Sequence, residues 1–180
     1  MFLSFSGEDV RDNFVSFLYK NLCKISSDVY IDNILEPAEK IETALMEAIK
    51  RSRIAVIIFS KSYASSTWCL KELEQIIEWN ESHGQMVIPV FYNVDSSHVH
   101  DPTAGIYAEA FARHEWNLKG NLVQRFRTAI SKALRLAFGL LWRAPERHQE
   151  DEKEVDRVQK WKNDMIKAAN FKGWDSKVIR

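Results

Sequence analysis

Two apolar runs constrain the fold of this chain more than any other feature. They read IAVIIFS at residues 54–60 and MVIPVFYNV at residues 86–94. Strands that are buried on both faces of a parallel sheet have this composition, because helices cover both sides of such a sheet. Proline cannot donate to a sheet ladder, so Pro89 fits poorly inside the second run, but the residues around it still predict a strand.

Segments with helical spacing alternate with these strands. The helical pattern covers residues 12–25, 41–51 and 68–83, and the chain after residue 105 is mostly helical as well. Shorter strand patterns occupy residues 1–5, 29–31 and 172–174. Alternating strands and helices predict an α/β protein with a parallel sheet between two helical layers.

The composition is that of an ordinary soluble domain with no strong electrostatic preference. Of the 180 residues, 46% are hydrophobic and 28% are charged, and the formal net charge is zero. These values predict neither nucleic-acid binding nor attraction to a membrane surface, and no apolar run is long enough to span a bilayer. Cys23 and Cys69 lie in helix-like apolar patterns, so we expect two buried free thiols and a cytoplasmic or nuclear protein. The histidines lack metal-ligand spacing, so no metal site is expected.

A candidate site lies where two polar loops follow strands. In a flavodoxin-like strand order, the loops after the first and third strands meet at the switch point, where ligands of such sheets bind. Those loops are residues 6–9 and 60–66. On the next helix, Trp68 and Glu72 are four residues apart and share one side, which suits a sugar and a flat ring. Spacing alone nevertheless favours a packing tryptophan and a solvated acid.

The residues of this site resemble those of plant TIR (Toll/interleukin-1 receptor homology) domains, as found in TIR-NB-LRR disease-resistance proteins. SKSYASSTWCLKEL at residues 60–73 closely matches the family pattern Ser-x-x-Tyr-Ala-x-Ser-x-Trp-Cys-Leu-x-Glu-Leu. FLSFSGEDVR at 2–11 and VIPVFYNVD at 87–95 resemble its first and fourth strands, and residues 158–180 resemble its tail. The resemblance implies a flavodoxin-like fold with five parallel strands in the order 2-1-3-4-5.

The resemblance also implies an activity, the cleavage of NAD⁺ to nicotinamide and ADP-ribose or cyclic ADP-ribose. The family's catalytic glutamate corresponds to Glu72. NAD would be the substrate, and no cofactor is expected. Loops 6–9 and 32–41 would close the pocket, whose expected lining residues are Ser6, Gly7, Ile41, Ser62 and Trp68.

By the same resemblance, the expected partners are other TIR domains. The candidate association surfaces are the first helix, at Ser16 and Phe17, and the loop that ends at Gly105. An alternative function is a catalytically weak TIR–TIR interaction module in plant defence signalling. Ser6 stands where the family usually has arginine and Ala38 where it usually has glycine, and both favour this alternative, whereas the intact 60–73 element favours catalysis.

Residues 117–150 have no counterpart in the family pattern. Apolar residues recur there at helical spacing, with a basic side. A membrane-surface or partner-binding helix is one interpretation, but an extra helix packed on the domain is favoured, because amphipathic helices most often face a core. We therefore expect a single TIR domain over residues 1–180, with a helical insertion at about 117–150 and without the family's last helix.

Overall fold

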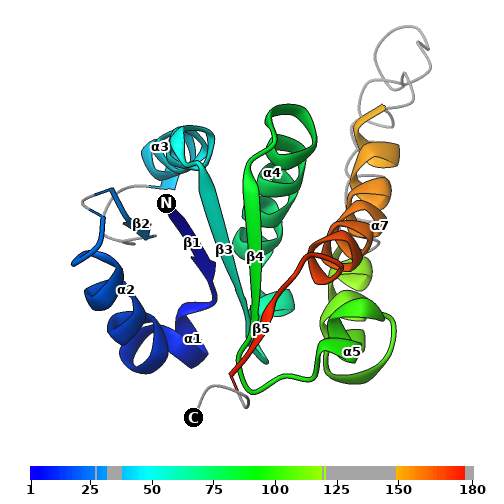
Figure 1. Cartoon of the computed structure of the whole chain (residues 1–180). Helices are drawn as coiled ribbons and strands as arrows, with labels where there is room; N and C mark the ends of the chain where they lie inside the picture. The colour runs from blue at the N-terminus through cyan, green and yellow to red at the C-terminus, as the bar shows by residue number, and fades with distance from the viewer. Residues whose placement is uncertain (27, 32–37, 119, 121–148, 177–180) are drawn as a thin grey trace, which may run out of the picture.

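A five-stranded parallel sheet forms the centre of the molecule. The computed structural model describes residues 1–26, 28–31, 38–118, 120 and 149–176 (Figure 1). The sheet has the order β2-β1-β3-β4-β5, with every pair parallel, so the predicted fold is confirmed. Its strands are β1 (Phe2–Phe5), β2 (Tyr30–Ile31), β3 (Ile54–Phe59), β4 (Met86–Phe91) and β5 (Trp174–Asp175).

Pro89 does lie within β4, opposite Ile57 of β3. The neighbouring strand β5 pairs with β4 only from Val90 onward, so the sheet is short on that side of the proline. Gly173 lies against the proline ring, where a Cβ would come within 2.7 Å of Pro89 Cγ. A missing side chain next to β4 thus lets the chain accommodate the proline.

Helices cover both faces of the sheet (Figure 1). One face carries α3 (Ala38–Arg51), α4 (Thr67–His83) and α7 (Gln149–Ala169), which share a core with the side chains of Phe2, Ile57 and Phe91. Leu3 and Ile58 point to the opposite face and pack against the segment after β1. That segment consists of α1 (Gly7–Val10), the π-helix η1 (Arg11–Val15) and α2 (Ser16–Leu22), while the short elements η2 (Tyr63–Ser65), α5 (Ser96–His100) and η3 (Gly105–Tyr107) lie in connections.

Two sequence predictions need correction here. The first helical region begins at Gly7 and not at residue 12, because the polar residues after β1 form helix α1 where a turn was expected. Cys69 is buried as predicted, but Cys23 is exposed, since it lies at the end of α2, past the apolar face.

None of the described helices is long and apolar enough to cross a membrane. The predicted insertion at 117–150 falls almost entirely outside the described residues, so its helical pattern stays a prediction.

Candidate functional site

The loops after β1 and β3 meet at the carboxyl edge of the sheet, as the strand order predicts. The backbone N–H of Ser62 donates to Asp9 Oδ2 at 2.7 Å, and Ser62 Oγ donates to Ser6 Oγ at 2.6 Å. A hollow of about 500 Å³ opens between the loops, within the size range of small-molecule sites. It is lined by Ser6, Gly7, Glu8, Arg11, Ser62, Ser65 and Ser66.

Helix α4 begins beside this hollow and places the predicted catalytic acid. Ser66 caps the helix, because its Oγ accepts a hydrogen bond from the backbone N–H of Cys69 at 3.3 Å. Glu72 follows on the second turn and is only 2% exposed. Ser4 Oγ of β1 donates to Glu72 Oε2 at 2.6 Å, so the side chain points inward to the sheet. The alternative of a solvated acid is therefore excluded.

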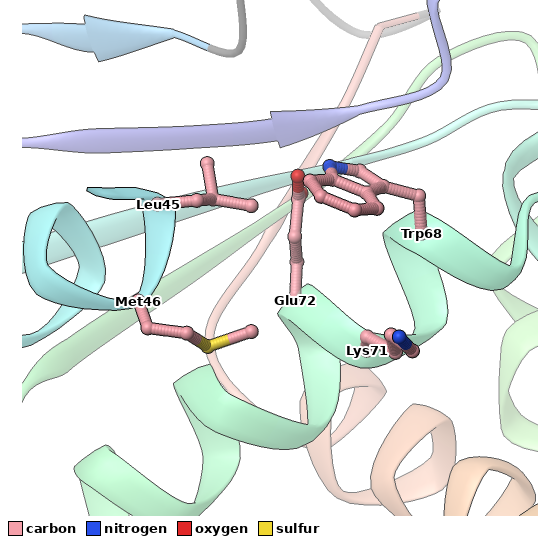
Figure 2. Close-up of a pocket in the computed structure, with 5 residues that line it drawn as sticks. All are labelled: Leu45, Met46, Trp68, Lys71 and Glu72. Atoms are coloured by element: carbon pink, nitrogen blue, oxygen red, sulfur yellow. The ribbon is translucent and has the colours of Figure 1, made fainter. Parts of the chain in front are cut away.

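A narrow pocket surrounds Glu72, and Trp68 forms one wall of it (Figure 2). Leu45 and Met46 of α3 close the other side, and the space between these side chains leaves no room for a water molecule. Trp68 Nε1 is buried and has no hydrogen-bond acceptor among the residues that the structure describes.

The predicted binding residues thus divide between two places, where the sequence predicted one hollow. Ser6, Gly7 and Ser62 line the larger hollow, whereas Trp68 and Glu72 line the closed pocket. The separation arises because Glu72 turns inward to β1 and α3 packs over it. The side chain of Ile41 lies outside the described residues, as does the loop at 32–37.

Two residues that the predicted site did not include, Ser4 and Tyr63, form a buried hydrogen-bond network with Glu72. Ser4 is fully buried, and its Oγ lies 2.9 Å from the hydroxyl of Tyr63, which is also fully buried. Burial raises the pKa of Tyr63 well above its usual range, and the nearby Cys69 and Glu72 raise it further, so the phenol stays protonated. A serine inside the otherwise apolar strand FLSF was the signal that could have revealed this network.

The predicted association residues lie on the surface. Ser16 is exposed, and its Oγ donates to the carbonyl of Arg11 at 2.6 Å. Phe17 is 70% exposed, the kind of apolar side chain that a partner can cover. Gly105 has φ +65° and lies against the ring of His98.

The chemistry of the hollow suits a polar ligand with an anionic group near Arg11, because the carboxylate of Glu8 lines the hollow as well. Serine hydroxyls supply donors and acceptors, and the guanidinium of Arg11, which lies over the ring of Phe5 at 5.1 Å, supplies positive charge. Within the described part of the chain, no group of three or more His, Cys, Asp or Glu side chains is placed to hold a metal ion.

The sheet order and the ligand-sized hollow at its carboxyl edge define a flavodoxin-like α/β protein with a site at the switch point. The sequence matches the TIR domain family over residues 1–140, and the chain belongs to that family.

Its relatives include plant disease-resistance proteins. It is 44% identical over 137 residues to disease resistance protein RPV1 of Vitis rotundifolia, covering 76% of this chain and 10% of that protein. It is 40% identical over 182 residues to disease resistance protein RUN1 of the same species, covering 99% of this chain and 14% of that protein. The chain therefore spans only a small part of these relatives' length.

A solved structure also resembles the whole chain. It contains the TIR domains of the activated Roq1 resistosome, which directly recognizes the pathogen effector XopQ. The TM-score is 0.72 at 35% identity, covering 98% of this chain and 87% of that one.

Proposed function

We propose that this TIR domain acts in plant immune signalling by associating with other TIR domains and cleaving NAD⁺ to nicotinamide and ADP-ribose or a cyclic product. The observation that carries the proposal is the Glu72 carboxylate, which lies beside the Trp68 indole at the start of α4 and next to the hollow-forming loops. The relationship to plant disease-resistance proteins supports the setting.

The chemistry needs little more than one carboxylate. As the bond between ribose C1′ and the pyridinium nitrogen breaks, its electron pair moves to the nitrogen, and nicotinamide leaves as a neutral molecule without needing a proton. The positive charge that develops on the ribose is stabilised by the carboxylate of Glu72. A water molecule, or an atom of the adenine in the cyclic product, then bonds to C1′, and a proton is released when water attacks.

Access to Glu72 requires movement in this mechanism. Because the pocket has no room for water, Leu45 and Met46 of α3 must separate from Trp68 before a ribose ring can enter. The neighbouring hollow already offers space and the charge of Arg11 for the phosphates. Contacts with a second TIR domain would supply the free energy for this opening.

The test is nicotinamide release from concentrated protein. We expect Glu72→Gln to lower the rate by about a hundredfold or more, the usual cost of losing a group that stabilises transition-state charge. Glu78→Gln is the matched control, because Glu78 is an exposed acid on the same helix. Equal rates for wild type and Glu72→Gln would remove Glu72 from the mechanism.

A second candidate function is TIR–TIR interaction without catalysis. Two observations favour it: the closed pocket at Glu72, and the uncharged Ser6 at a position where the family usually has arginine. This function is supported if the wild type releases no nicotinamide at any concentration while its mass in solution rises with concentration.

A further inference from the structure

Three hydroxyl and carbonyl contacts connect Glu72 to the interior of the protein. Ser4 Oγ lies 2.6 Å from Glu72 Oε2 and 2.9 Å from the Tyr63 hydroxyl. The Tyr63 hydroxyl in turn lies 3.2 Å from the backbone carbonyl of Cys69. Ser4, Tyr63, Cys69 and Glu72 are all buried, so water does not compete for these contacts.

The number of protons fixes the direction of each hydrogen bond when Glu72 is ionised. Ser4 has one hydroxyl proton and donates it to the carboxylate. The short contact between Ser4 and Tyr63 then needs a proton from Tyr63, because two lone pairs would otherwise face each other. In this state Ser4 donates to Glu72, and Tyr63 shares its one proton between Ser4 Oγ and the more distant Cys69 carbonyl.

Protonation of Glu72 reverses the chain. The carboxyl group then donates to Ser4 Oγ, Ser4 donates to Tyr63, and Tyr63 donates to the carbonyl of Cys69. One proton arrives from solvent, each hydroxyl rotates, and every contact has a single proton. The protonated state therefore has three protons for three contacts, whereas the ionised state has two, and the ionised state is stabilised chiefly by the bond from Ser4 to the charged carboxylate.

We propose that Ser4 and Tyr63 are positioning residues for Glu72: the Ser4 hydroxyl holds the carboxylate against β1 and favours its charged form, and Tyr63 orients that hydroxyl. The link to catalysis rests on the proposed function, whereas the effect on the charge state of Glu72 does not. Neither residue needs to touch substrate, because both act through the carboxylate.

The experiment is a pH titration of the Glu72 carboxyl group by ¹³C NMR on the whole chain, assigned with Glu72→Gln. A hydrogen bond to a charged group stabilises the charged form, so Ser4→Ala should move the titration midpoint up by about one pH unit. Tyr63→Phe leaves the Ser4 donor in place, so its midpoint should stay closer to that of wild type than the midpoint of Ser4→Ala does. If Ser4→Ala fails to fold, Ser4→Cys decides the outcome, because a thiol keeps the shape but is a weak donor and should also raise the midpoint.

Ser52→Ala is the matched control. Ser52 is a buried serine whose Oγ has no hydrogen-bond partner among the described residues, so its removal should leave the midpoint unchanged. Unchanged midpoints in Ser4→Ala and Ser4→Cys would overturn the proposal. If the midpoint shifts but the wild type releases no nicotinamide, the positioning role stands and the proposed catalysis fails. If the midpoint shifts and the wild type does release nicotinamide, the loss of activity at low pH should move to higher pH in Ser4→Ala, together with the midpoint.

Discussion

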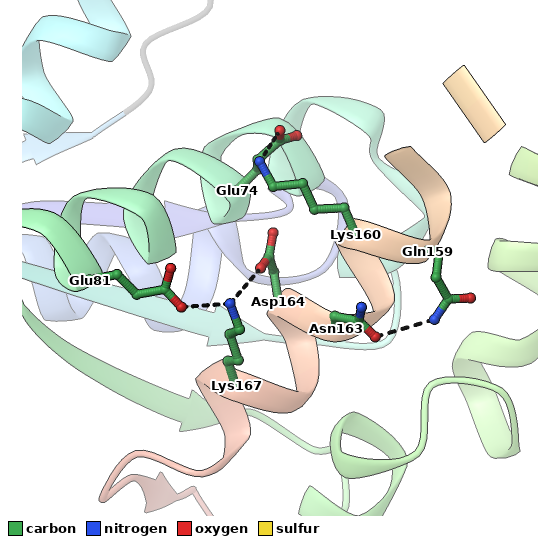
Figure 3. Close-up of polar contacts among 7 residues, drawn as sticks. All are labelled: Glu74, Glu81, Gln159, Lys160, Asn163, Asp164 and Lys167. Atoms are coloured by element: carbon green, nitrogen blue, oxygen red, sulfur yellow. Dashed lines mark hydrogen bonds and ion pairs between the residues drawn. The ribbon is translucent and has the colours of Figure 1, made fainter. Parts of the chain in front are cut away.

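The buried carboxyl group of Asp164 lowers the free energy of unfolding when it is ionised. Replacing this residue tests how burial controls stability. It lies on α7 against α4 and is 2% exposed (Figure 3). Its Oδ2 is buried with no hydrogen-bond partner among the described residues, and its Oδ1 is 3.9 Å from Lys167 Nζ. Lys160 donates a hydrogen bond to Glu74, and Lys167 donates one to Glu81. The nearby lysines are therefore paired mainly with carboxylates of α4 and not with Asp164.

The magnitude follows from the change in proton affinity. Burial raises the pKa of Asp164 to about 6 from an ordinary 3.8; Glu74 and Glu81 add to the rise, and Lys167 and Lys160 oppose it. At 1.36 kcal/mol per pH unit, the difference corresponds to about 3 kcal/mol at most. The folded protein holds this proton more tightly than the unfolded chain does. The stabilisation is therefore complete below about pH 4 and is lost as the pH rises to about 6.

The predicted effect of Asp164→Asn is a stability difference that grows with pH. Asparagine keeps the shape of the side chain but carries no charge. The variant therefore does not lose stability at this position between pH 4 and pH 6, as wild type does. We expect its free energy of unfolding to match that of wild type near pH 4 and to exceed it by up to about 3 kcal/mol above pH 6. Other titrating groups are common to both proteins and cancel in the difference.

Urea unfolding followed by circular dichroism, at half-unit pH steps from 4 to 7.5, measures this difference. Asp156→Asn is the control, because Asp156 is exposed on the same helix and surface changes usually stay within about 0.5 kcal/mol. A difference between Asp164→Asn and wild type that stays flat across this range would refute the argument from burial.

Two further substitution experiments follow from the backbone and the surface. Gly84 and Gly105 both have positive φ, but a Cβ at Gly84 meets open space whereas one at Gly105 would lie 2.6 Å from His98 Cδ2. We expect Gly84→Ala to cost about 1 kcal/mol and Gly105→Ala clearly more, measured by urea unfolding; equal costs would contradict the contact. Phe17→Ser should leave stability within about 0.5 kcal/mol of wild type but lower the concentration-dependent mass in light scattering, and an unchanged mass would exclude the α2 surface.

Much of the sheet was predictable because its strands are buried on both faces. The runs at 54–60 and 86–94 have few polar residues, and in such a setting only a strand between helices fits. The first helix was harder to locate. Gly7, Glu8 and Asp9 are typical turn residues, yet they form helix α1, whose first turn favours acidic side chains.

The candidate site was predictable in position but not in detail. Strand order alone places Ser6 beside Ser62, and the structure confirms that contact. Whether Glu72 faces the hollow or the sheet depends on Ser4 and on the packing of α3, which are contacts between segments far apart in the sequence. The spacing of apolar residues in the sequence shows which side of a helix a residue lies on, but it does not show which distant segments pack against that side.

The two buried acids of the described chain point to one region as the place where the fold opens. Glu72 belongs to α4 and Asp164 faces α4 from α7, and carboxylates withdrawn from water cost free energy even when they are paired. An opening that hydrates α4 recovers part of that cost, whereas an opening of the α1–α2 side does not. If the separation of α4 from α3 that exposes Glu72 also loosens α4 from α7, Asp164→Asn should release nicotinamide more slowly at pH 7 although it is more stable. A faster rate in the stabilised variant would show that the packing of α4 does not limit access to Glu72.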